Sequence, residues 1–227
     1  MIFPIGDDQV KGGSFPIFSY AFIALNIAVF VYEVQLMGRG EEAFNNFLFT
    51  YGSIPVEILN GQDLPTLFTS MFLHGGWMHI IGNMLFLWVF ADNIEAVVGN
   101  TRFVIFYILG GLAAHAAHIY FNMESSIPTV GASGAISAVM GAYLVMFPKS
   151  RIKLLFFVIT FRVPALLFLG FWIFQQVNAG VAGLSQLGEE AGVAWWAHIG
   201  GFVFGVLAGF YFRSRGLTEH ALNEQYA

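Results

Sequence analysis

One serine and one histidine form the residue pair with the clearest chemical potential. Ser133 stands in the small-residue segment TVGASGAISAVMG (129–141), and His198 stands in WWAHIGGFVFG (195–205). A serine hydroxyl is a weak nucleophile that needs an adjacent base to accept its proton. Histidine suits that role because its unperturbed pKa is about 6.5. If the two side chains meet, the pair could attack a carbonyl carbon and transfer an acyl group.

Acyl transfer also needs hydrogen-bond donors for the negative charge that develops on the carbonyl oxygen. His79 and Asn83 are four residues apart in HGGWMHIIGN (74–83), so they share one helix face and could supply these donors. The backbone N–H of Ser133, at a helix N-terminus, is a further candidate. Gly131 permits the tight backbone that such a site requires.

No carboxylate stands where it would complete a Ser–His–acid triad. The acidic candidates lie elsewhere: Glu33 in the first apolar segment, Asp92 and Glu95 at the inner end of the second, and Glu189 and Glu190 in the loop before the last. We therefore predict a Ser133–His198 dyad in which packing and backbone contacts orient the histidine.

The composition indicates an integral membrane protein that lies in a lipid bilayer. Hydrophobic residues make up 57% of the 227 residues and charged residues 10%, whereas soluble domains carry about 25% charged residues. The absence of cysteine excludes disulfides, thiolate zinc sites and cysteine nucleophiles. The net charge of −5 and the lack of a basic patch give no indication of a nucleic-acid partner. Residues 1–15 do not read as a cleavable signal, so we expect the first apolar segment to remain in the membrane.

Six apolar segments are candidates for membrane-spanning helices, each of which needs about 20 mostly apolar residues. We predict them at residues 16–37, 66–91, 103–121, 132–147, 163–179 and 194–213. Arg162 and Pro164 interrupt the apolar run before the fifth helix, so we expect residues 151–161 to form an interfacial hairpin or strand. The predicted fold class is an all-α polytopic bundle of six transmembrane helices, with residues 1–227 as a single domain.

The basic residues predict the orientation of this bundle, because Lys and Arg favour the cytoplasmic side. Arg39 alone falls on the outer side of the predicted topology. The other eight fall on the inner side: Lys11, Arg102, Lys149, Arg151, Lys153, Arg162, Arg213 and Arg215. We therefore expect both termini inside, with residues 1–15 and 214–227 as cytoplasmic segments. His79, Ser133 and His198 then lie at similar depth near the outer face.

Small residues predict which helices touch. Gly201, Gly205 and Gly209 recur every four residues on the face that also carries His198, and such ridges let helix backbones approach closely. The fourth predicted span carries a matching set: Gly134, Ala138, Gly141 and Ala142. Packing of these two faces would bring Ser133 to His198.

These residues resemble the rhomboid family of intramembrane serine proteases. GASG (131–134) resembles the GxSG nucleophile motif of the family, and AHIGGFVFG (197–205) resembles its histidine motif. HGGWMHIIGN (74–83) is similar to the signature of its second span, and DNIE (92–95) to the acidic end of the same helix. The resemblance covers all six predicted spans in order.

The resemblance implies a role for each site residue. Ser133 would be the nucleophile and His198 the general base and then the general acid. His79 and Asn83 would line the oxyanion hole, and His74 would support the site at its water-facing entrance. The family uses no cofactor and cleaves membrane-spanning segments of other proteins, so we expect transmembrane substrates. It also implies that the fifth span and the loop at 178–196 form a substrate gate and cap, and it favours a bacterial inner membrane.

The sequence departs from the family pattern at two places. Pro65 and Thr66 stand in the first outer loop, where many members carry Trp-Arg. Ser137 stands where many members place a tyrosine that stacks on the base, so His198 must be held in another way.

Two other classes of function stay open at the sequence level. His115 and His118 are three residues apart on one helix face, which is acceptable spacing for metal ligands. With the other histidines they suggest a metal-binding or ion-transporting membrane protein, although the HExxH pattern is absent. A non-catalytic relative that binds membrane proteins is the second alternative, but it would usually have lost the nucleophile or the base. The oligomeric state is left open.

Overall fold

The computed structural model describes residues 2–8, 13–185 and 194–218. Lys11, Glu189 and Glu190 lie outside these described residues, as do residues 186–193 of the predicted cap loop and the predicted C-terminal tail from residue 219 onward.

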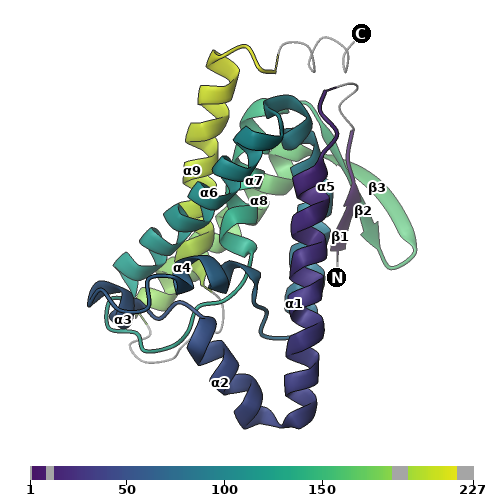
Figure 1. Cartoon of the computed structure of the whole chain (residues 1–227). Coiled ribbons are helices and arrows are strands. Elements are labelled where there is room, and N and C mark those ends of the chain that lie inside the picture. The colour runs from purple at the N-terminus through teal and green to yellow at the C-terminus, as the bar shows by residue number, and fades with distance from the viewer. Residues whose placement is uncertain (1, 9–12, 186–193, 219–227) are drawn as a thin grey trace.

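The described chain is mostly helical, and its long helices run side by side (Figure 1). They are α1 (Ile17–Arg39), α5 (Trp77–Val98), α6 (Asn100–Phe121), α7 (Ser133–Met146), α8 (Ala165–Ser185) and α9 (Trp195–Ser214). The connection from α1 to α5 holds the short helices α2 (Glu41–Tyr51), α3 (Pro55–Leu59) and α4 (Thr66–Thr69) and the 3₁₀ helix η1 (Ser70–Phe72). Five helices of the described chain are long and apolar enough to cross a membrane, and α7 is a shorter apolar helix.

The predicted span at 66–91 is wrong at both ends. The helix begins at Trp77, because Gly75 and Gly76 interrupt the apolar run and glycine disfavours helix. It continues to Val98 and ends at Gly99, whose positive φ of 83° suits glycine. The other five predicted spans each coincide with a helix of the structure, with shifts of a few residues at their ends.

A small antiparallel sheet modifies the prediction of an all-α fold. Its strands are β1 (Ile2–Gly6), β2 (Arg151–Phe156) and β3 (Ile159–Pro164), in the order β1-β2-β3. The hairpin predicted at 151–161 is confirmed as β2 and β3. The pairing of β1 with β2 was not predicted, because its partner lies far away in the sequence.

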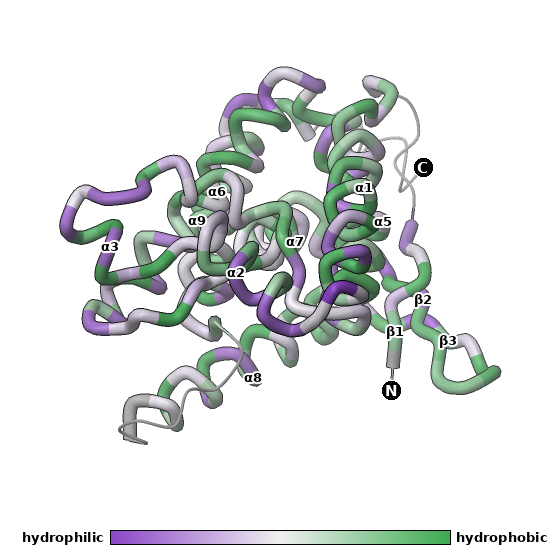
Figure 2. The backbone as a smooth tube through the Cα atoms, turned by 60° about the horizontal axis from the view of Figure 1, so that its bottom comes forward, coloured by the Kyte–Doolittle hydropathy of each residue, from purple (hydrophilic) through white to green (hydrophobic). Residues whose placement is uncertain are grey.

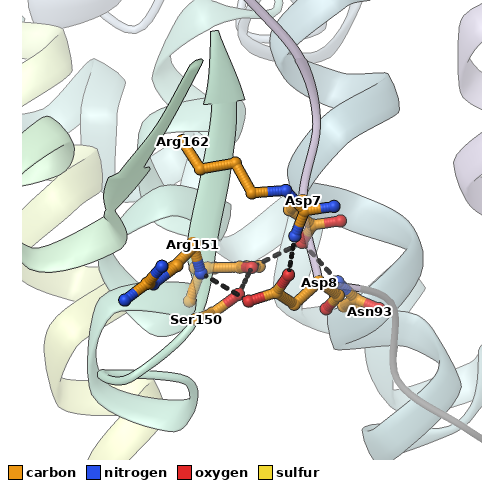
Figure 3. Close-up of polar contacts among 7 residues, drawn as sticks. Asp7, Asp8, Asn93, Ser150, Arg151 and Arg162 are labelled. Atoms are coloured by element: carbon orange, nitrogen blue, oxygen red, sulfur yellow. Dashed lines mark hydrogen bonds and ion pairs between the residues drawn. The ribbon is translucent and has the colours of Figure 1, made fainter.

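Two acidic residues fasten β1 to the ends of the helices, as Figure 3 shows. The Asp7 carboxylate accepts hydrogen bonds from the Tyr143 hydroxyl of α7 and from the Asn93 amide of α5. Asp8 forms an ion pair with Arg162 of β3. The N-terminal segment therefore joins three elements at the end of the bundle opposite the starts of α5 and α7.

The central helix is α7, in which 12 of the 14 residues are buried. In Figure 2 it lies between α1 and α5 on one side and α6 and α9 on the other. The outer helices instead expose large apolar side chains, among them Phe171 (62% exposed) and Leu207 (65% exposed). Exposed apolar surface of this kind on long helices fits contact with lipid. The protein is an integral membrane protein with several apolar helices.

The predicted contact between the small-residue faces of α7 and α9 is confirmed. A Cβ atom added at Gly205 would lie 1.9 Å from the carbonyl oxygen of Ala138, and one at Gly201 would lie 2.1 Å from that of Gly134. Backbone therefore meets backbone along this contact, and no larger residue fits at either glycine.

This contact predicts a large difference between two glycine substitutions. Gly205→Ala should destabilise the protein by about 1–3 kcal/mol, because overpacking forces α7 and α9 apart. Gly170→Ala in α8 is the matched control, since a Cβ atom there meets nothing within 4 Å. Thermal unfolding in detergent measures both effects, and equal melting temperatures for the two variants would contradict the packing.

Candidate active site

The starts of three helices converge at one end of the bundle. Ser133 is the first residue of α7, His198 lies in the first turn of α9, and His79 and Asn83 lie in the first two turns of α5. The connection of α2 to η1 covers the same end (Figure 1), where the Gly131 N–H donates to the carbonyl of Ser70 at 2.8 Å. The structure thus brings together residues from three distant parts of the sequence.

Ser133 and His198 are in direct contact. The Ser133 hydroxyl oxygen lies 2.8 Å from Nε2 of His198. This is within the hydrogen-bond reach that a nucleophile and its base require.

A third side chain contacts the histidine, and it was not predicted. Oε1 of Gln176, from α8, lies 2.7 Å from Nδ1 of His198. The expectation that only packing and backbone orient His198 is therefore wrong. The sequence signal was a pair of glutamines within an apolar helix, where polar side chains are expensive and tend to be functional.

Aromatic rings and Ser137 complete the surroundings of the dyad. The rings of Trp172 and Trp195 lie 5.8 Å and 6.1 Å from the imidazole of His198, centroid to centroid. Ser137, at the position where many rhomboid proteins carry a tyrosine, instead donates to the carbonyl of Ser133 at 2.6 Å. The aromatic rings near the imidazole of His198 thus come from α8 and α9, and Ser133 is its contact with α7.

Two donors converge on Gly131. The Gly75 N–H donates to Nδ1 of His79 at 3.3 Å, so the ring proton of a neutral His79 sits on Nε2. A Cβ atom at Gly131 would lie 2.7 Å from that Nε2 and 3.6 Å from Nδ2 of Asn83. Gly131 also has a φ of 125°, which favours glycine.

The side-chain amide of Asn83, which lies beside Gly131, provides a further hydrogen-bond donor. Its side chain is 7% exposed, and its Nδ2 is buried without a hydrogen-bond partner among the described residues. Such a group is costly unless a ligand satisfies it. Together with Nε2–H of His79 and the N–H of Ser133, which lacks an acceptor within its own helix, it could bind an oxyanion.

A cavity of about 650 Å³ opens onto these groups from among α5, α7, α8 and α9. Its polar lining includes Ser133, His198, His79 and Asn83. The remaining wall is largely apolar: Trp77, Met78, Phe86, Val130, Ile136, Met140 and Trp172. A space of this size and character suits an apolar peptide segment with its carbonyl at the polar end.

His74 does not lie at a water-facing entrance, and that prediction is wrong. The residue is 0% exposed, and its ring packs 5.1 Å from the ring of His79 and 6.5 Å from that of Phe30, centroid to centroid. Its backbone N–H donates to the Glu33 carboxylate at 3.0 Å. The buried ring of His74 therefore packs against the rings of His79 and Phe30.

The remaining histidines have other contacts. Nε2 of His115 lies 3.1 Å from the Ser70 hydroxyl, and Nδ1 of His118 lies 3.4 Å from the Asn122 amide. Within residues 2–8, 13–185 and 194–218, no group of three or more His, Asp or Glu side chains is placed to hold a metal ion.

Comparison with known proteins gives the family. The model of the rhomboid domain matches residues 61–215. This chain belongs to the rhomboid family. The match covers α4 to α9 and so includes every residue of the convergent site.

Several curated rhomboid proteins are similar to this chain. Rhomboid protein 1, mitochondrial, of Saccharomyces cerevisiae is 27% identical over 202 residues, which cover 85% of this chain and 52% of that protein. Rhomboid protease GluP of Bacillus subtilis is 32% identical over 136 residues, 60% of this chain and 26% of that protein. RHOMBOID-like protein 1 of Arabidopsis thaliana is 30% identical over 158 residues, 70% of this chain and 37% of that protein. The chain thus spans about half or less of the length of these relatives.

The unused Asn83 donor predicts an uncommon combination of effects. Asn83→Ala should slow the reaction of Ser133 with a fluorophosphonate by roughly 100-fold, the effect of losing one oxyanion donor. It should not lower the melting temperature, because it removes a buried donor without a partner. Asn178→Ala is the control, since that amide bonds the Phe174 carbonyl of its own helix. Unchanged labelling in Asn83→Ala would contradict the oxyanion role.

Proposed function

We propose that this rhomboid-family protein is an intramembrane serine endopeptidase that cleaves transmembrane segments of other proteins. The observation that supports the proposal is the 2.8 Å contact between the Ser133 hydroxyl and Nε2 of His198, at a cavity with an apolar wall. The Bacillus subtilis relative carries the name rhomboid protease, which agrees with this activity.

The geometry supports a two-step reaction. His198 accepts the Ser133 proton while the oxygen attacks the carbonyl carbon of the substrate. His79, Asn83 and the N–H of Ser133 stabilise the resulting oxyanion. The protonated His198 then donates to the leaving amine, and a water molecule hydrolyses the acyl-enzyme by the same route.

The length of α7 supports a position for this chemistry below the membrane surface. Its 14 residues span about 21 Å, whereas the hydrocarbon core is about 30 Å thick. With its C-terminal end at the inner face, Ser133 would lie roughly 9 Å below the outer face. The cavity would then bring water to the dyad.

The topology and the location belong to the same proposal. It includes six passages through the membrane, counting the short α7, with both termini inside and residues 1–227 as one domain. The bacterial inner membrane is also part of it, although the similar proteins include mitochondrial ones and give that location no support.

Removal of either dyad residue tests the activity. Ser133→Ala and His198→Ala should each lower cleavage of a single-span substrate by roughly a thousandfold or more. Ser214→Ala is the control, because that hydroxyl bonds only the Tyr211 carbonyl within α9. Cleavage that survives both dyad substitutions would refute the proposal. Loss of cleavage on chelation, in a protein that carries stoichiometric metal, would favour the metal-binding alternative.

The pH dependence tests His198 as the base. A protonated imidazole cannot accept the serine proton, so cleavage should fall as the pH drops through the titration of His198. As the pH is raised, the rate should recover in a step that corresponds to the loss of one proton from His198. A pH profile of kcat/KM measures this step. A rate without an acid limb at any pH at which the protein stays folded would argue against this role.

A further inference from the structure

We propose that Gln176 is a positioning residue that fixes the tautomer and the orientation of His198, the task that a carboxylate performs in a Ser–His–acid triad. This inference rests on the proposed serine-protease function. It assigns a role to a side chain of α8 that neither the motifs nor the dyad chemistry requires.

The backbone carbonyl of Trp172, which can only accept a hydrogen bond, fixes the orientation of the Gln176 amide. Nε2 of Gln176 donates to the backbone carbonyl of Trp172 at 3.2 Å, one turn earlier in α8. A carbonyl oxygen has no proton to give, so the NH₂ group must face it. The other end of the amide, Oε1, is therefore the atom that faces His198 at 2.7 Å.

The histidine tautomer follows from the amide. Oε1 of Gln176 is an acceptor, so Nδ1 of His198 must carry the proton in this bond. In a neutral imidazole Nε2 then holds a lone pair, and it lies 2.8 Å from the Ser133 hydroxyl. The opposite tautomer would aim its one N–H at the Ser133 hydroxyl and a lone pair of Nδ1 at the Oε1 acceptor of Gln176, so it could not accept the serine proton. The chain of contacts from Trp172 to Ser133 thus selects the one tautomer that can act as a base.

Burial makes this selection effective. Gln176 is 6% exposed, so little water competes for its amide or for Nδ1 of His198. The titratable groups whose charge would act on His198 are His79 of α5 and His118 of α6. The positioning acceptor is therefore neutral, which distinguishes this site from a triad with an anionic partner.

The placement of Gln176 on α8 links the base to the position of that helix. Ser133 and His198 belong to α7 and α9, which are close-packed, whereas α8 lies at the edge of the bundle (Figure 2). A displacement of α8 would break the contact with Gln176 and leave the contact between Ser133 and His198 in place. The orientation of His198 by Gln176 thus requires α8 to stay packed against α9.

Three variants of the full chain test the inference, with fluorophosphonate labelling of Ser133 measured against pH. Gln176→Met keeps the length of the side chain and removes the acceptor, and it should slow labelling by about 10–100-fold, part of the contribution of general-base catalysis. Gln176→Glu restores an acceptor and should recover most of the rate. Its carboxylate favours the imidazolium, so the acid limb should move to higher pH by about half a unit or more. Gln175→Met is the control, because Gln175 is exposed on the same helix.

The outcomes separate this inference from the proposed function. Labelling of Gln176→Met at the rate of the unaltered protein would overturn the positioning role. Equal slowing in Gln176→Met and Gln176→Glu with an unmoved acid limb would also overturn it, since that pattern reports packing alone. Neither result affects the dyad, provided that Ser133→Ala abolishes labelling. Failure of the unaltered protein to label or to cleave substrate would instead refute the proposed function.

Discussion

The close contact of α7 with α9 is the constraint on which the candidate site depends. Both helices begin at the same end of the bundle, and their backbones touch at Gly201 and Gly205. This contact sets the separation of their first turns, which carry Ser133 and His198. Because a membrane offers no hydrophobic drive between helices, small residues and van der Waals contact must supply the association. The packing of α7 against α9 therefore places the Ser133 hydroxyl within hydrogen-bond reach of the His198 imidazole.

The polar groups of the site form two chains that start from the backbone. One runs from the Trp172 carbonyl through Gln176 and His198 to Ser133. The first bond sets the orientation of the Gln176 amide, and the second places the ring proton of His198 on Nδ1. The other runs from the Gly75 N–H to His79 and directs a donor toward Gly131. Each chain ends at the cavity, where Asn83 adds a donor without a partner. A buried donor without a partner lowers the stability of the fold, and under the proposed function the oxyanion of the substrate would satisfy it.

Much of this arrangement could be predicted from the sequence, because it depends on spacing within single helices. The glycine ridge of α9 and the shared face of His79 and Asn83 follow from local periodicity, and the hairpin before α8 follows from Arg162 and Pro164, which interrupt the apolar run. The contact of Gln176 with His198 could not be predicted, since a pair of adjacent glutamines does not reveal which one faces α9. The burial of His74 and the pairing of β1 depend on contacts between distant segments. The start of α5 was misplaced because hydropathy outweighed the Gly75–Gly76 break.

The central claim is that Ser133 reacts because His198 is packed against it. Mass spectrometry of peptides from fluorophosphonate-treated protein tests this claim most directly, because it locates the adduct on a single residue. The account predicts one adduct, on Ser133, that is absent from His198→Ala although this variant remains folded. An adduct on another residue, or one that forms on Ser133 equally well without His198, would contradict it.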